Sequence, residues 1–290
     1  MLASFLKPVA RLPLSCFHRV GIVIGWLMYW GSPTYSRRVK ENLFGSGVCS
    51  TEQQYRGLIT QTVRETGKTA TEWVKIWFAS DASMGCLIAE VRGWSLVEDA
   101  RGSGRGIIFL LPHLGSFQVL MRYIAQHMAL TALYRPPKQK LRRIFDNAGS
   151  RNAGLSLART DLSGVQKIYK ALATGGAVAL PPDQAPNSRG GMWADFFGRP
   201  AYTMTLPKKL QQATGAALIA AYAERLEGGE GFRLKFQFVE AKDFDERALN
   251  RTVEDLVRQC PGQYLWSYNR YKVPRKSEVK RRKPVPSYGA

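Results

Sequence analysis

Short apolar runs alternate with helical patterns through the middle of the chain. Residues 106–111, 130–135 and 177–180 are apolar runs typical of buried strands, and 119–128 and 164–173 carry apolar residues at helical spacing. Strands that alternate with helices along a chain usually form a parallel sheet, because each helix carries the chain back to start the next strand. The sequence therefore predicts an α/β fold with a mostly parallel central sheet flanked by helices.

The regions around this core suggest the organisation of the whole chain. Residues 216–225 are predicted to form another strand, and 232–239 alternate as a half-buried antiparallel edge strand would. We expect residues 195–200 to form an aromatic loop. Further helices are expected at 36–44, 51–77, 141–149, 203–214 and 249–260. The predicted organisation is an N-terminal apolar helix in 1–32, an α/β domain in 33–272 and a mobile basic tail in 273–290.

The N-terminal segment is apolar but short. The uninterrupted run from Val20 to Trp30 falls below the roughly 20 residues that a membrane-spanning helix needs. Basic residues flank it on both sides, so the charge gives no orientation. These features favour an amphipathic helix that lies in the membrane interface, with a buried core helix as the alternative.

Composition restricts the kinds of partner. The formal net charge is +20, which indicates an anionic partner such as nucleic acid, an anionic membrane, a phosphorylated substrate or an acidic protein. The chain has no recognisable nucleic-acid-binding module, and its N-terminus is strongly apolar, so we expect no nucleic acid partner. The four cysteines show no CxxC spacing, so we expect them to be free thiols. The three histidines do not have the spacing of a zinc site, and we expect neither a metal nor a cofactor.

Polar side chains follow three of the predicted strands. His113, Arg135 and Asp183 each stand where a strand ends, and ligands of parallel sheets gather at the carboxyl ends of the strands. The partial positive charge of a helix N-terminus favours a neutral imidazole at position 113, which is the form that acts as a base. A lone histidine is more often a half-buried core residue, but the convergence of the three strand ends favours a functional site.

Several motifs of the chain occur together, in the same order, in one known family. They are His113–Gln118, Tyr134–Pro136, Pro182–Gln184, Phe196–Gly198 and Leu265–Lys272. The chain resembles the bacterial late acyltransferases of lipid A biosynthesis, which include lauroyl and myristoyl transferases, over nearly its whole length. The resemblance implies a glycerolipid-acyltransferase-like fold. It also implies that a fatty acyl group is transferred from acyl carrier protein to a hydroxyl of a phosphorylated lipid A precursor, at the cytoplasmic face of the cell inner membrane.

The chain departs from this family at one catalytic position. The family motif is a histidine followed, after four intervening residues, by a carboxylate, and here that position is Gln118. The resemblance implies that His113 is the general base and that residue 118 holds its ring. Three alternatives are open: a working His–Gln pair, another acid such as Asp183 in the role of the carboxylate, or a protein that has lost transfer and kept lipid binding. A different membrane-lipid acceptor is a further alternative.

The remaining candidate site residues are expected to bind substrate. Arg135 and Arg151 are candidates for phosphate or phosphopantetheine contacts, because a guanidinium binds such oxygens through two hydrogen bonds. Asp183 and Gln184 are expected to organise the site. Phe197 and Gly198 are expected to line the acyl pocket, with a packed aromatic loop as the alternative.

Overall fold

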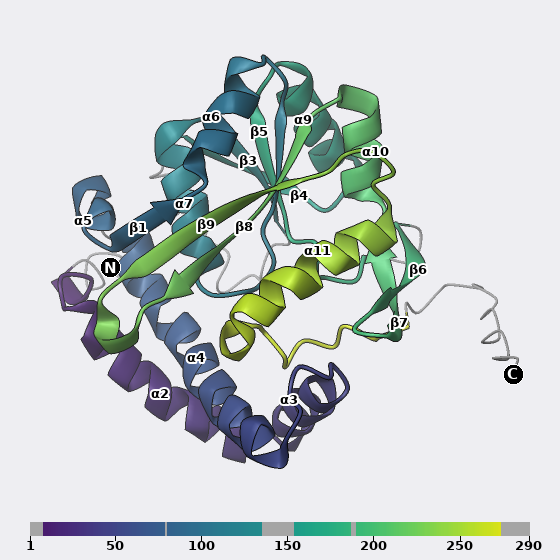
Figure 1. Cartoon of the computed structure of the whole chain (residues 1–290). Coiled ribbons are helices and arrows are strands. Elements are labelled where there is room, and N and C mark those ends of the chain that lie inside the picture. Colours follow the sequence, from purple (N-terminus) through teal and green to yellow (C-terminus); the bar gives the residue numbers. More distant parts are fainter. Residues whose placement is uncertain (1–7, 79, 135–153, 187–189, 274–290) are drawn as a thin grey trace, which may run out of the picture.

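A seven-stranded sheet forms the centre of the computed structural model, which describes residues 8–78, 80–134, 154–186 and 190–273 (Figure 1). The strands lie in the order β1-β9-β8-β2-β5-β3-β4. All neighbouring pairs are parallel except β8 and β9, which are antiparallel, so the predicted mostly parallel sheet is confirmed. The strands are β1 (Ile88–Arg92), β2 (Ile107–Leu110), β3 (Leu130–Tyr134), β4 (Leu155–Arg159), β5 (Ala177–Leu180), β8 (Ala217–Arg225) and β9 (Phe232–Val239).

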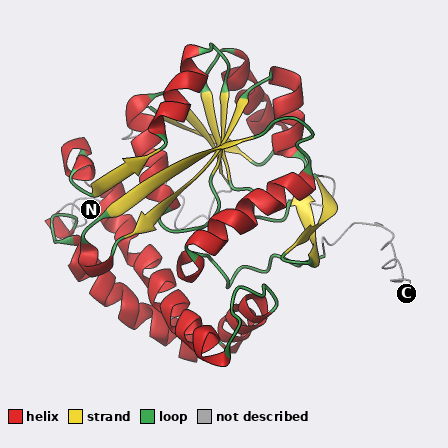
Figure 2. Cartoon of the chain, in the orientation of Figure 1, coloured by secondary structure: helices red, strands yellow, loops and turns green. Residues whose placement is uncertain are grey.

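Helices surround this sheet (Figure 2). Helix α6 packs on β2, β8 and β9, helix α7 on β3, β4 and β8, helix α9 on β3, β4 and β5, and helix α11 on β8. The described helices are α2 (Leu14–Gly31), α3 (Pro33–Phe44), α4 (Glu52–Phe78), α5 (Asp81–Gly85), α6 (Trp94–Gly102), α7 (Phe117–His127), α9 (Leu162–Ala173), α10 (Leu206–Thr214) and α11 (Glu246–Gln259). The predicted α/β architecture therefore holds.

The core lies at β2 and β5, the central pair of the sheet. All four residues of each strand are buried, which explains why both strands are continuous apolar runs without alternation. The two strands pair in parallel from Ile107 opposite Ala177 to Leu110 opposite Leu180. Their carboxyl ends therefore emerge side by side at one edge of the sheet, and the segments that follow them are brought together.

Two local predictions are wrong. The strand at 232–239 is β9 and is antiparallel to β8, but it is not an edge strand, because β1 pairs with its other side. Residues 195–200 are not a loop but the tip of a hairpin, formed by β6 (Gly191–Phe196) and β7 (Arg199–Met204). Phe197 and Gly198 make its turn with φ values of 48° and 69°. A phenylalanine in this left-handed conformation is rare, so the sequence carried no ordinary turn signal.

Helix α2 packs closely against α4 at the lower left of Figure 1. A Cβ on Gly67 of α4 would lie 1.9 Å from the carbonyl oxygen of Gly21, so the two backbones can approach only with glycine there. The other face of α2 exposes Val23 (59% exposed) and Leu27 (61% exposed). Within the described residues, no helix combines the length and the apolarity that crossing a membrane requires.

Candidate active site

His113 lies in a tightly held loop between β2 and α7. The backbone N–H of Gly115 donates to the carbonyl oxygen of Gln263 at 3.0 Å, and that of Ser116 donates to Ala223 at 2.8 Å. Gly115 has a φ of 61°, and a Cβ there would lie 1.9 Å from the Ala223 carbonyl oxygen. Only glycine fits this position, and the loop is consequently fixed with the His113 side chain facing the end of β5.

Asp183 holds the imidazole of His113 from the neighbouring strand end. Asp183 follows β5, and its Oδ1 lies 3.0 Å from His113 Nδ1. Its Oδ2 accepts the backbone N–H of His113 at 2.9 Å. An ionised carboxylate can only accept hydrogen bonds, so Nδ1 carries the proton and Nε2 keeps its lone pair. The sheet register explains this pair, because parallel neighbouring strands place both residues at one edge.

The electrostatics of the pair follow from its burial and its charges. Burial disfavours the imidazolium, but the Asp183 carboxylate outweighs this and raises the pKa of His113 above its usual value. Burial acts against the Asp183 carboxylate, yet the charge and hydrogen bonds of His113 lower the pKa of Asp183 below its usual value. The aspartate therefore remains ionised at neutral pH and stabilises a proton on the imidazole.

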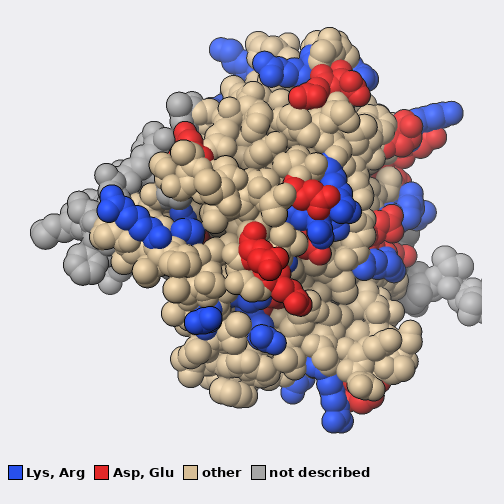
Figure 3. Space-filling view, turned by 60° about the vertical axis from the view of Figure 1, so that its left-hand side comes forward, with Lys and Arg blue, Asp and Glu red and all other residues tan. Residues whose placement is uncertain are grey.

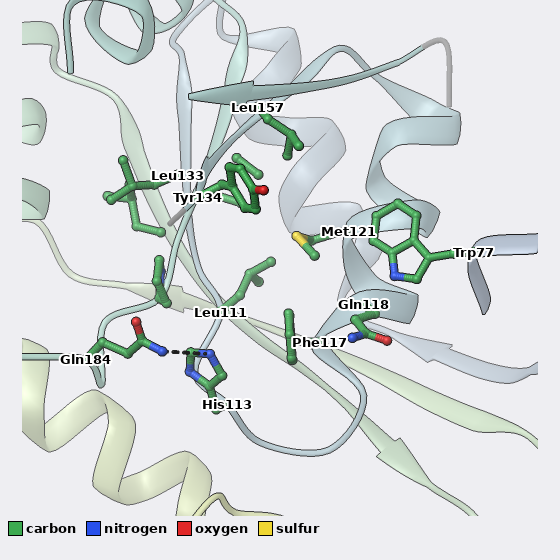
Figure 4. Close-up of a pocket in the computed structure, with 14 residues that line it drawn as sticks. Trp77, Leu111, His113, Phe117, Gln118, Met121, Leu133, Tyr134, Leu157 and Gln184 are labelled. Atoms are coloured by element: carbon green, nitrogen blue, oxygen red, sulfur yellow. Dashed lines mark hydrogen bonds between the residues drawn. The ribbon is translucent and has the colours of Figure 1, made fainter. Parts of the chain in front are cut away.

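Gln184 occupies the other ring nitrogen. Its side-chain amide donates to His113 Nε2 at 3.1 Å, as Figure 4 shows. This contact confirms that Nε2 presents a lone pair that accepts a hydrogen bond. A hydroxyl placed where the Gln184 amide lies would be in position to give its proton to Nε2.

A cavity of about 280 Å³ opens beside His113 (Figure 4). Carbon atoms dominate its wall, which comes from α4, α7, β3, β4 and β5 and from the segments that follow β2 and β5. The lining residues are Trp77, Leu111, His113, Phe117, Gln118, Met121, Ala132, Leu133, Tyr134, Leu157, Ala179, Leu180, Pro181 and Gln184. Such a cavity suits an apolar chain whose reactive end lies at the imidazole.

Gln118 does not reach the imidazole, although its position is that of the family carboxylate. Both ring nitrogens of His113 are taken, by Asp183 and Gln184. Gln118 is buried in the first turn of α7, and the ring of Phe117 stands between it and His113 in Figure 4. Of the alternatives left open by the sequence, the geometry matches the one in which Asp183 orients the histidine.

The other predicted substrate-binding residues fall elsewhere. Phe197 and Gly198 are not among the residues that line the cavity, and the Phe197 ring packs instead against Phe196 at 4.8 Å between centroids. This packing matches the alternative of a packed aromatic segment, and a role of Phe197 and Gly198 in binding the acyl chain stays a prediction. Arg135 and Arg151 lie outside the described residues, as do residues 274–290 of the predicted tail.

Sequence reasoning missed most of the cavity wall. Phe117 and Met121 share one face of α7 at a spacing of four residues, and this signal was available. Leu133 and Leu157 come from β3 and β4, so only the sheet register brings them together with α7. Within the described ranges, no group of three or more His, Cys, Asp or Glu side chains is arranged to hold a metal ion.

A buried ion pair beneath the His113 loop was also missed. Arg225, at the end of β8, donates through Nε and Nη2 to Glu72 of α4 at 2.8 and 2.7 Å. The same Nη2 donates to the carbonyl oxygen of Gly115 at 2.9 Å, and His18 of α2 lies 3.3 Å from Glu72. Burial opposes ionisation of Glu72, but the Arg225 charge and these hydrogen bonds lower its pKa to about 2. The pair thus connects α2 and α4 to the loop that carries His113.

Comparison with known proteins relates this geometry to a family. The family of bacterial lipid A biosynthesis acyltransferases matches residues 1–273 of the chain. The chain is 26% identical to a lipid A biosynthesis lauroyltransferase of Escherichia coli K12 over 273 residues, which cover 91% of this chain and 88% of that protein. It is 26% identical to a palmitoleoyltransferase of the same pathway and organism over 223 residues, 74% of this chain and 72% of that protein. The chain, with its histidine–aspartate pair beside an apolar cavity, therefore belongs to the bacterial lipid A biosynthesis acyltransferase family.

Proposed function

We propose that the protein transfers a fatty acyl group from acyl carrier protein to a hydroxyl group of a lipid A precursor. The observation that carries this proposal is the carboxylate-held imidazole of His113 at the end of an apolar cavity. An acyl chain in the cavity would have its thioester carbonyl beside the imidazole. Family membership supports lipid A as the class of acceptor.

The proposed reaction uses His113 as general base. Nε2 removes the proton of the acceptor hydroxyl as its oxygen attacks the thioester carbonyl carbon. Asp183 keeps the proton on Nδ1 and stabilises the imidazolium that forms. The tetrahedral intermediate then collapses, the carbon–sulfur bond breaks, and the departing thiolate takes the proton from the imidazolium. The products are an ester and the free thiol of acyl carrier protein.

Gln184 has a second role in this proposal. In the structure its amide donates to Nε2, which is the position that the acceptor hydroxyl must take. When the acceptor hydroxyl takes the place of the Gln184 amide at Nε2, the N–H groups of Gln184 remain beside the reacting carbon. They are then in position to donate to the oxyanion of the tetrahedral intermediate, the group for which preorganised donors matter most.

The charge of the chain supports the proposed partners. Acyl carrier protein is acidic, lipid A precursors carry phosphates, and the inner membrane surface is anionic. A net charge of +20 suits all three partners. It also speeds association with them by attracting them from a distance.

We further propose that the exposed face of α2 lies on the cytoplasmic face of the inner membrane. Val20, Val23, Leu27 and Trp30 recur at helical spacing on this face and are between 56% and 70% exposed. In Figure 3, which brings this side of the molecule forward, wide uncharged areas separate small groups of charged side chains, some of Lys and Arg and others of Asp and Glu. An apolar helix face accompanied by basic side chains is typical of a helix that lies in the interface.

Acyl transfer by purified protein tests the proposed function. The assay follows transfer from acyl carrier protein thioester to a lipid A precursor for wild type, His113→Ala and His127→Ala. His127 is exposed at the far end of α7 and serves as the matched control histidine. We expect turnover to fall by about 10²-fold or more for His113→Ala, because general-base catalysis is lost, and to be unchanged for His127→Ala.

Other results would overturn this proposal in distinct ways. Wild-type turnover by His113→Ala would mean that the base is a different residue. Transfer to a glycerolipid instead of lipid A would change the acceptor. Lipid binding without any transfer would assign the chain to a non-enzymatic lipid-binding role, the alternative that Gln118 raised from the sequence.

A further inference from the structure

Both backbone groups of Gly115 are held by residues outside the His113 loop. The Gly115 N–H donates to the carbonyl oxygen of Gln263 at 3.0 Å, and the Gly115 carbonyl oxygen accepts from Nη2 of Arg225 at 2.9 Å. Gly115 lies two residues after His113 and has a φ of 61°. Because the peptide groups on both sides of its Cα are bonded to fixed partners, the backbone next to His113 has little freedom to rotate.

The two partners of Gly115 are bonded to each other. The side-chain amide of Gln263 accepts from the backbone N–H of Arg225 at 2.8 Å and donates to the backbone carbonyl oxygen of Arg225 at 2.9 Å. Arg225 is the last residue of β8, so this amide pairs with the end of β8 as an antiparallel strand would. Arg225 and Gln263 therefore act on Gly115 as one unit, which we call the Gly115 clamp.

Helix α4 fixes the guanidinium of Arg225. Nε and Nη2 donate to the Glu72 carboxylate at 2.8 and 2.7 Å, and Nη2 also donates to Thr69 Oγ1 at 2.6 Å. In Figure 1 the arrow of β8 accordingly ends beside α4. A guanidinium bonded through two nitrogens to one carboxylate has a single orientation, so Nη2 stays directed at the Gly115 carbonyl oxygen.

The ion pair alone does not explain why an arginine stands here. Apolar residues of similar volume can often replace a buried ion pair without loss of stability. The carbonyl oxygen of buried Gly115 does require a donor, because a buried acceptor without a partner costs free energy. Arg225 supplies this donor, and Glu72 compensates the buried charge that comes with it.

We propose that Arg225 is a positioning residue for the general base, and that together with Gln263 it clamps Gly115 so that His113 stays in contact with Asp183. Arg225 acts through the backbone of the loop, since the described residues that line the cavity include neither Arg225 nor Gln263. Loss of the clamp should therefore lower kcat and leave binding of the acyl chain largely unchanged. The inference rests on the proposed function and adds a residue on which its base depends.

Arg225→Lys tests the clamp, because it keeps the positive charge and removes the planar fork that bonds Glu72 and Gly115 together. Acyl transfer by purified protein should show kcat lowered by about tenfold or more, with KM for the acyl donor within about twofold of wild type. The pH inflection of kcat should also move to lower pH, because a displaced His113 loses part of the effect by which Asp183 raises its pKa. Since the charge at position 225 is unchanged, this shift reports the geometry of the loop.

A second variant and a control separate positioning from stability. Gln263→Met removes the side-chain bonds to Arg225 at similar volume and keeps the ion pair with Glu72. It should lower kcat by about fivefold or more and shift the inflection in the same direction, and it decides the test if Arg225→Lys does not fold. Leu172→Ala is the control, because Leu172 is buried in α9 against Gly106, which precedes β2 at the opposite edge of the sheet. It should lower the melting temperature and leave kcat and the inflection unchanged.

The outcomes separate this inference from the proposed function. A lower melting temperature of Arg225→Lys with wild-type kcat and inflection would overturn the inference and leave the proposed function intact, because the pair would then serve stability alone. An equal loss of kcat in Leu172→Ala would also overturn it, because any loosening of the core would then slow the reaction.

Titration of the His113 imidazole by NMR covers the case in which no acyl chain is transferred. That result would refute the proposed function but not the clamp. The spectrum of His113→Ala identifies the resonance of His113 among those of the three histidines. A lower pKa of His113 in Arg225→Lys than in wild type would support the clamp without catalysis, and an unchanged pKa would refute it.

Discussion

Replacement of Asp183 by asparagine is the most informative change to the proposed chemistry. The carboxylate makes two contacts with His113: Oδ1 with the ring Nδ1 at 3.0 Å, and Oδ2 with the backbone N–H at 2.9 Å. Asparagine has one oxygen and one NH₂ group in these two places. If its oxygen accepts from the ring, its NH₂ faces the backbone donor. If its oxygen accepts from the backbone, its NH₂ donates to Nδ1 and forces the proton onto Nε2.

Both arrangements impair the base, by an amount that can be bounded. The first loses the negative charge that stabilises the imidazolium, and the second places the proton on the nitrogen that must accept one. General-base catalysis contributes about 10²- to 10⁴-fold, and loss of an orienting aspartate in serine proteases costs about 10⁴-fold. We therefore expect Asp183→Asn to lower kcat/KM by about 10²- to 10⁴-fold.

The pH dependence gives an independent readout of the same change. Asp183 raises the pKa of His113 against the effect of burial, and the base works only when it is neutral. The wild-type rate should therefore rise with pH through an inflection above the usual histidine value. In Asp183→Asn burial acts alone, so the inflection should move to lower pH while the plateau falls.

The assay is kcat/KM for acyl transfer from pH 5 to 9, with a thermal melt of each variant to verify folding. Asp161→Asn is the matched control: Asp161 is an exposed cap at the start of α9, where asparagine caps equally well. A rate within about twofold of wild type, or an unchanged inflection, would refute the role assigned to Asp183.

Three further changes test other parts of the structure. Glu72→Gln removes the charge that pairs with buried Arg225, so the free energy of unfolding measured with urea at pH 7 should fall by about 3–5 kcal/mol. The pKa of Glu72 is lowered to about 2 in the folded protein, so its contribution to the free energy of unfolding is present above the unfolded pKa of about 4.5 and is lost as the pH falls toward 2. The unfolding free energies of wild type and variant should therefore converge in acid. A difference that stays constant with pH would contradict this. Gly115→Ala places a Cβ 1.9 Å from a carbonyl oxygen of β8. Because the loop that carries His113 must then shift, acyl transfer should fall by at least about tenfold. Wild-type turnover by this variant would show that the loop geometry is not required. Leu27→Asp, on the exposed face of α2, should weaken cosedimentation with anionic vesicles by about tenfold or more. Leu162→Asp is the control, because Leu162 is 75% exposed on α9, and it should leave cosedimentation unchanged. Equal effects of the two changes would refute α2 as the membrane-binding face.

The sequence predicted those parts of the fold that local patterns determine. The buried strands β2 and β5 are short apolar runs, and their parallel pairing follows from the helices between them. That pairing is also why His113 and Asp183 could be expected at one edge. In contrast, β1 carries Glu90 and Arg92 within five residues and has no strand signal of its own. It forms because β9 offers it a partner, which is a tertiary effect.

The site was less predictable where it depends on distances between separate elements. Spacing along one helix could not decide which side chain holds His113, because the register of the sheet brings Asp183, and not Gln118, to the imidazole. The same holds for Phe197, whose aromatic character suited an acyl pocket equally well. Its place at a hairpin tip, packed against Phe196 and away from the cavity, depends on an unusual backbone conformation.

The most direct test of the central claim is the mass of lipid A from cells that lack this protein. We expect that one acyl chain is lost, that wild-type protein restores it, and that neither His113→Ala nor Asp183→Asn does so. Lipid A of unchanged mass in the deletion strain, or full restoration by His113→Ala, would contradict it.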